Sequence, residues 1–102
     1  MTDLIIEGDP ELLEELRREI EATLGAQAQL EPITSTAVGE FREPIIIGLI
    51  VALGGPAIIT GIVDIVDRVL THRERMAELR LKVLEDDEET VVTLDDVRGM
   101  AS

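Results

Sequence analysis

The chain has 102 residues, a formal net charge of −13, no cysteine and a single aromatic residue, Phe41. Its length predicts one small domain, 1–102, with an aliphatic core. The charge disfavours nucleic acid as a partner, because phosphate binding needs a basic surface. The lack of cysteine excludes disulfides and thiolate metal sites and fits a reducing cytoplasm.

The first third of the chain predicts a strand, a helix and a second strand. Leu4–Ile6 is a short apolar run. Asp9–Glu11 then begins a helix, because aspartate caps free amides and proline fits the first turn. Apolar residues recur with helical spacing up to Gly25, a natural helix end. Ala28–Ile33 predicts the second strand, and Pro32 favours an edge position for it.

The segment Pro44–Val63 has twenty residues and no ionisable side chain. Its first half, Ile45–Leu53, is apolar all round and predicts a helix buried in protein or in lipid. Gly54–Pro56 weakens and interrupts that helix. We therefore expect an apolar helical segment over 44–70 that is broken at 54–56.

The second half of this segment carries a polar stripe. Thr60, Asp64, Asp67 and Thr71 follow the spacing i, i+4, i+7 and i+11, which places them on one side of a helix. One interpretation is a stripe that faces water or Arg68. The other is an interior lining of an oligomer or channel, since ionisable groups beside apolar segments tend to face an interior.

The C-terminal part predicts a β-hairpin. Glu78–Val83 alternates polar and apolar residues, with Arg80 and Lys82 outward, and Thr90–Leu94 is a second strand. The acidic turn Asp86–Glu89 between them faces water. The residues that follow resemble the cap of a further helix that barely starts. The order of strand, helix, strand, long broken helix and hairpin predicts an α+β fold around a small sheet.

No catalytic constellation is visible in the sequence. His72 is the only histidine, and no cysteine or second histidine can join it in a ligand set. The serines lack a G-x-S-x-G setting, and Gly54–Pro56 lacks the Lys-Ser/Thr of a phosphate loop. The acidic turn lacks the spacing of a calcium loop. We therefore expect no enzyme, no cofactor and no metal site.

The apolar segment is long enough to cross a bilayer, about 30 Å as a helix. The interruption at Gly54–Pro56 weakens the interpretation as a membrane-spanning helix. A span would also place the N-terminal strand and the C-terminal hairpin on opposite sides of the membrane, so they could not share one sheet. Gly48 with Ala52, and Ala57 with Gly61, would let helices approach closely in an oligomer. The residues expected to contact lipid or other copies are Ile45, Ile46, Ile47, Gly48, Leu49, Ile50, Val51, Leu53, Gly54, Gly55, Pro56, Ile58, Ile59 and Ile62.

Several motifs occur in a characteristic order: Glu7–Asp9 after a strand, Leu30–Pro32 before a Gly39–Glu40 loop, Leu49–Gly55, and Asp95–Val97 after the hairpin. In this order and spacing the chain resembles the effector-associated constant component family of prokaryotic conflict systems. The resemblance covers nearly the whole chain. Members usually have a further helix after the hairpin, which we expect to be missing or truncated here. The resemblance implies a non-enzymatic component encoded beside variable effector or regulatory modules, proteases among them.

Two functions follow from these observations. In the first, the protein is a membrane-active, pore-forming defence component. A partner effector or protease would expose residues 44–70 of a cytoplasmic form, which would then associate as a homo-oligomer and enter the inner membrane. In the second, it is a soluble adaptor that docks a partner effector through the apolar helix, with the hairpin edge supplying recognition. The absence of a basic region before Leu4–Ile6 argues against a signal peptide and for a cytoplasmic start.

Overall fold

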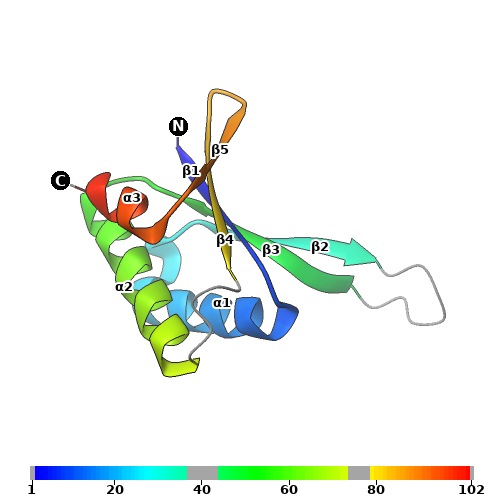
Figure 1. The fold of residues 1–102 in the computed structure, drawn as a ribbon. Coiled ribbons are helices and arrows are strands. Elements are labelled where there is room, and N and C mark those ends of the chain that lie inside the picture. The colour runs from blue at the N-terminus through cyan, green and yellow to red at the C-terminus, as the bar shows by residue number, and fades with distance from the viewer. Residues whose placement is uncertain (1, 37–43, 74–78, 102) are drawn as a thin grey trace.

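The computed structural model describes residues 2–36, 44–73 and 79–101, which form a five-stranded antiparallel sheet with helices on one face (Figure 1). In chain order the elements are β1 (Asp3–Glu7), α1 (Pro10–Leu24), the 3-10 turn η1 (Gly25–Gln27), β2 (Leu30–Thr36), β3 (Pro44–Ala52), α2 (Pro56–Arg73), β4 (Arg80–Glu85), β5 (Glu88–Val92) and α3 (Leu94–Gly99). The predicted α+β class is confirmed.

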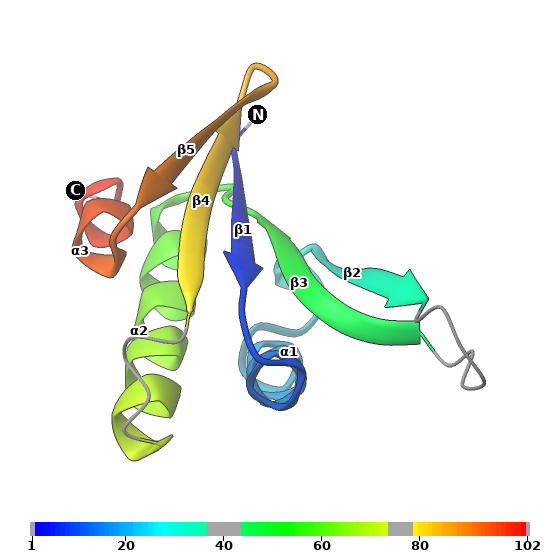
Figure 2. The ribbon, with the colours of Figure 1, turned by 45° about the vertical axis from the view of Figure 1, so that its right-hand side comes forward.

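The strands lie in the order β2-β3-β1-β4-β5, and every neighbouring pair is antiparallel. From β1 to β4 this is the split β-α-β, or ferredoxin-like, arrangement, with α1 and α2 packed against each other on the same side of the sheet (Figure 2). The hairpin strand β5 and the helix α3 are additions to it. This topology serves many unrelated activities, so it does not indicate a function by itself.

The prediction of a helix over residues 44–53 is wrong. Pro44–Ala52 is β3, which lies between β1 and β2 in the sheet. An apolar run without periodicity does not distinguish a buried strand from a buried helix, and the β-branched residues Ile45–Ile47 favour a strand. The break predicted at Gly54–Pro56 is real, but it is the turn between β3 and α2. Pro56 is the first residue of α2.

The predicted edge strand and hairpin are both confirmed. β2 is the edge strand at one end of the sheet and contains Pro32. β4 and β5 are joined by Asp86 and Asp87, whose positive φ angles of 49° and 65° fit a two-residue hairpin turn. The turn is shorter than predicted because Glu88 and Glu89 belong to β5. The other end of the predicted first hairpin strand, Glu78, lies outside the described residues.

A complete short helix follows the hairpin, where the sequence predicted only a start. Thr93 and Asp96 close a capping box: the Asp96 amide donates to Thr93 Oγ1 at 3.2 Å, and the Thr93 amide donates to Asp96 Oδ2 at 2.9 Å. Val97 anchors the helix in the core, where it is fully buried. Of the two expectations for the further helix, missing or truncated, the first is wrong, because the six residues of α3 form a helix there.

The core is aliphatic and lies between the helices and one face of the sheet. Its largest fully buried side chains are Leu4, Ile6, Leu12, Leu13, Leu16, Ile20, Leu49, Val51, Ile62, Val63, Ile65 and Val66. Gly61 lets the two long helices approach closely, because a Cβ there would lie 3.0 Å from Leu24 Cδ2. The sequence predicted that Gly61 lets helices of different copies approach, but Gly61 contacts α1 of the same chain. Gly48 and Ala52, the other predicted pair, lie in the strand β3 and not in a helix.

Candidate functional site

The described residues contain no group of three histidine, cysteine or acidic side chains that could hold a metal ion. His72 is exposed near the end of α2. It borders a depression of about 290 Å³ together with Glu15, Glu19 and Arg68. Arg68 Nη2 lies 3.6 Å from Glu19 Oε2, so the depression is the site of an ion pair between α1 and α2.

The residues expected to contact lipid do not gather on one surface. Leu49, Val51, Leu53, Ile59 and Ile62 are buried in the protein's own core, and Ile46 and Ile58 pack against that core. Ile50 and Gly48 lie on the other face of the sheet, Gly54 and Gly55 lie in the turn before α2, and Pro56 is the first residue of α2. Ile47, at a shift in the β2–β3 register, is 46% exposed, and the side chain of Ile45 is outside the described part. In the described ranges, no helix has the length and apolar character needed to cross a membrane.

The polar stripe of α2 faces away from the core. Thr60, Asp64 and Thr71 are exposed, and Asp67 is partly exposed. In the single chain the stripe is therefore exposed, as both interpretations require. The lining of an oligomer or channel by these residues stays a prediction.

The face of the sheet opposite the helices carries aliphatic side chains that no described helix covers (Figure 2). Alternation along the strands sends Leu4 and Ile6 into the core and Ile5 to the opposite side. Ile5 is only 6% exposed, yet it is not part of the core cluster. We call the part of this surface on β2, β3, β1 and β4 the open face: Asp3, Ile5, Glu7, Glu31, Ile33, Gly48, Ile50, Ala52, Arg80, Lys82 and Leu84. On β5, Glu89 and Val91 lie on the same side of the sheet, opposite Leu84 and Lys82. The sequence predicted only that Arg80 and Lys82 point outward.

One row of side chains crosses the open face at a fixed register. Glu31 pairs with Ile50, Ile50 with Ile5, and Ile5 with Lys82, from β2 through β3 and β1 to β4. Lys82 Nζ lies 2.9 Å from Glu7 Oε1, and its side chain is only 22% exposed. The row therefore runs from an acid through two isoleucines to a base. A groove of about 430 Å³ opens at its β2 end, beside Glu31 and Ile50.

The second candidate surface is the outer edge of β5, which pairs with no other strand among residues 2–36, 44–73 and 79–101 (Figure 1). Val91 is 69% exposed there. Five consecutive acidic residues, 85–89, surround the hairpin turn, and all are exposed. None of the described cations forms an ion pair with them. This edge therefore combines free backbone groups, an exposed apolar residue and a negative charge.

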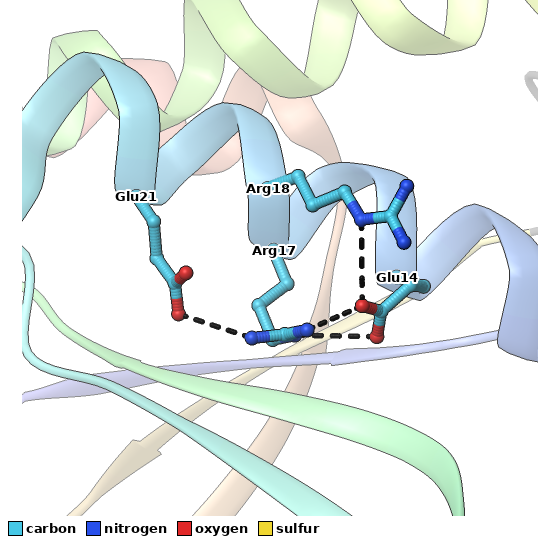
Figure 3. A network of polar contacts seen from close by, with 4 residues as sticks. All are labelled: Glu14, Arg17, Arg18 and Glu21. Carbon is cyan, nitrogen blue, oxygen red and sulfur yellow. Dashed lines mark hydrogen bonds and ion pairs between the residues drawn. The ribbon is translucent and has the colours of Figure 1, made fainter.

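A network of ion pairs lies on the exposed side of α1 (Figure 3). Arg17 bonds Glu14 and reaches Glu21, with Arg17 Nη1 3.3 Å from Glu21 Oε1, and Arg18 Nε lies 3.6 Å from Glu14. The hydrogen bond from Arg17 holds the pKa of the Glu14 carboxyl below its ordinary value of 4.5, against the opposing effect of desolvation. These are helix-surface pairs at i,i+3 and i,i+4 spacing, so they support the helix and form no binding site.

We expect Arg17→Gln to return the Glu14 pKa toward 4.5. The pKa of Glu14 is lowered in the folded state by Arg17. The Arg17–Glu14 interaction therefore contributes fully to stability above about pH 5, and this contribution is lost as the pH falls through the lowered pKa. The stability difference between the variant and the wild type should therefore shrink in acid. Carboxyl NMR titration measures the pKa, and Arg98→Gln, which removes the pair with Asp95 on α3, is the control. A Glu14 pKa that does not move in Arg17→Gln would contradict the assignment.

Sequence reasoning missed the open face because it placed Ile50 on a helix. The signal that could have revealed it is the period-two pattern in β1 and β4, where Ile5 and Lys82 fall between core positions. Searches of protein-family models, curated proteins and solved structures found no match to this chain.

Proposed function

We propose that this protein is a non-enzymatic adaptor of a prokaryotic conflict system that binds a partner effector chain through the free edge of β5. The defence role rests on the family resemblance, and the docking site rests on the structure. The observation that carries it is an unpaired edge strand with Val91 69% exposed. Unpaired N–H and C=O groups along such an edge are a template for another strand.

The apolar helix is less suited to docking than the sequence suggested. The apolar side chains of α2, such as Ile62 and Val66, are already buried in the protein's own core. Its outer side presents the polar stripe instead. This supports moving the docking site from α2 to the hairpin, which projects from the end of the sheet (Figure 1).

The charge of the hairpin specifies the chemistry of the partner. Glu88 and Glu89 lie on the edge strand, and like charges placed directly opposite one another destabilise a strand pair. A second β5 is therefore a poor partner for this edge. An extended segment that alternates apolar and basic residues fits it, because its cations would face the acidic residues while its backbone completes the sheet.

The membrane-active function has less support. Residues 45–53 would have to leave the sheet to meet lipid, and β3 is paired with β1 on one side and β2 on the other. Removing β3 would break its pairing with β1 and with β2 and would expose the core. The adaptor function requires no such rearrangement and fits a protein that remains in the cytoplasm.

The test is binding to the product of the neighbouring effector or protease gene, measured by co-purification and calorimetry. The Glu88→Lys/Glu89→Lys double variant should weaken binding about tenfold or more, as expected for reversed charges at an interface. Asp64→Lys/Asp67→Lys makes the same charge change on α2 and should leave the affinity unchanged. Release of dye from phosphatidylethanolamine–phosphatidylglycerol vesicles by the wild type, with no binding to these gene products, would overturn the adaptor function in favour of the membrane-active one.

A further inference from the structure

We infer that the open face binds the open face of a second copy, around a two-fold axis that runs along the strands between β3 and β1. The inference goes beyond the adaptor function and uses a different surface. It rests on three features of the open face: its uncovered aliphatic residues, the order of its charges and its local charge balance.

The first feature is the apolar middle of the open face. An antiparallel sheet with one face in water normally alternates apolar residues inward with polar residues outward. Here Ile5, Ile33, Ile50 and Leu84 break that alternation on four adjacent strands. Leu84 and Ile50 are partly exposed and touch no part of the core cluster. Ile33, Ile50 and Leu84 are partly exposed, and covering them on both copies supplies a hydrophobic driving force for association, to which Ile5, only 6% exposed, adds little.

The second feature is that the charges are complementary to their own two-fold copy. The row across the sheet is Glu31, Ile50, Ile5 and Lys82. A two-fold axis between β3 and β1 exchanges the two central positions, so Ile50 of one copy lies over Ile5 of the other. The same operation places Glu31 over Lys82 of the other copy, twice in the dimer. An interface of this kind is isologous, with each contact made in duplicate.

The third feature is the local charge. The chain as a whole carries −13, which keeps copies apart unless a specific surface offsets the repulsion. On the open face the carboxylates of Asp3, Glu7 and Glu31 are nearly balanced by Arg80 and Lys82. The acidic residues of α1 lie on the other side of the sheet, and Glu89, on the same side as the open face, belongs to β5, outside the two-fold overlap. Two copies that meet through the open face therefore face less repulsion than the total charge of −13 implies.

Packing within the chain accounts for the glycine in the middle of β3. A Cβ at Gly48 would lie 3.1 Å from Ile33 Cδ1 and 3.3 Å from the Ile6 carbonyl, so the position is already tightly packed within the chain. Gly48 pairs with Glu7 across β3 and β1. The two-fold axis therefore places Gly48 over Glu7 of the other copy.

The experiment measures mass by analytical ultracentrifugation over a concentration series. The wild type should reach twice 11.2 kDa. Glu31→Lys places lysine over Lys82, and Lys82→Glu places glutamate over Glu31, so each variant alone should dimerise about tenfold or more weakly. An equimolar mixture of the two variants restores both opposite-charge pairs in a heterodimer and should recover the doubled mass.

Three results would overturn the inference: a wild type that remains monomeric, single variants that dimerise as well as the wild type, or a mixture that stays monomeric. Asp64→Lys, the same charge change on α2, is the matched control and should leave the dimer intact. Circular dichroism of each variant establishes that it is folded. The Glu88→Lys/Glu89→Lys double variant should also remain dimeric, so failure of the dimer and failure of the adaptor function give different results.

Discussion

Leu49→Ala should lower the free energy of unfolding by about 2–5 kcal/mol, the usual cost of truncating a buried leucine. Leu49 is fully buried on the core side of β3, directly paired with Ile6 of β1. Removing its side chain leaves a cavity between the sheet and the helices. Urea unfolding followed by circular dichroism measures the change.

Ile47→Ala is the matched control for this prediction. Ile47 lies on the same strand, two residues before Leu49, and is 46% exposed. We expect a change within about 0.5 kcal/mol, as is typical of surface substitutions. Residues two apart on a regular strand share a face, so the expected difference depends on the shift in the β2–β3 register, which leaves Ile47 without a partner in β2. Equal effects at the two positions would contradict the exposed position of Ile47 beside that shift.

Ile62→Asp should destabilise the protein by more than about 4 kcal/mol, because it buries an unpaired carboxylate. Ile62 is fully buried on the face of α2 that packs on the core. Small domains have a total stability of about 5–15 kcal/mol, so this variant should be largely unfolded or aggregated. Thermal unfolding followed by circular dichroism measures the loss.

Thr60→Asp introduces the same carboxylate two residues earlier on the exposed side of α2. It should fold like the wild type and change stability by less than about 0.5 kcal/mol. A folded Ile62→Asp variant would show that α2 does not use this face for the core of the single chain. The apolar face would then be free for a partner, as the sequence alone suggested.

The two proposed surfaces are compatible in one assembly. A two-fold axis between β3 and β1 places β2 of one copy over β4 of the other, so each β5 lies beyond the overlap. A dimer through the open faces therefore leaves both β5 edges free, on opposite sides. Two edges on one dimer would bind a dimeric or repetitive effector with higher avidity than either edge alone.

Local chemistry in the sequence determined several elements correctly. Pro10 begins α1, and Gly25, with a φ of 56°, ends it. Pro32 placed β2 at an edge because proline has no amide to donate to a neighbouring strand. Gly54–Pro56 marked a true interruption. These signals act within a few residues of chain, so they can be recognised without knowledge of the tertiary structure.

Only the tertiary structure decided that residues 44–52 are a strand and that α2 is an intrachain core helix. β3 is specified by pairing with β1 and β2, from Glu7 opposite Gly48 to Leu30 opposite Val51, across separations that local pattern does not encode. A run that is apolar at every position has no period from which to choose between helix and strand. The same pairing creates the row from Glu31 to Lys82, because side chains from four distant segments become neighbours only when the sheet forms.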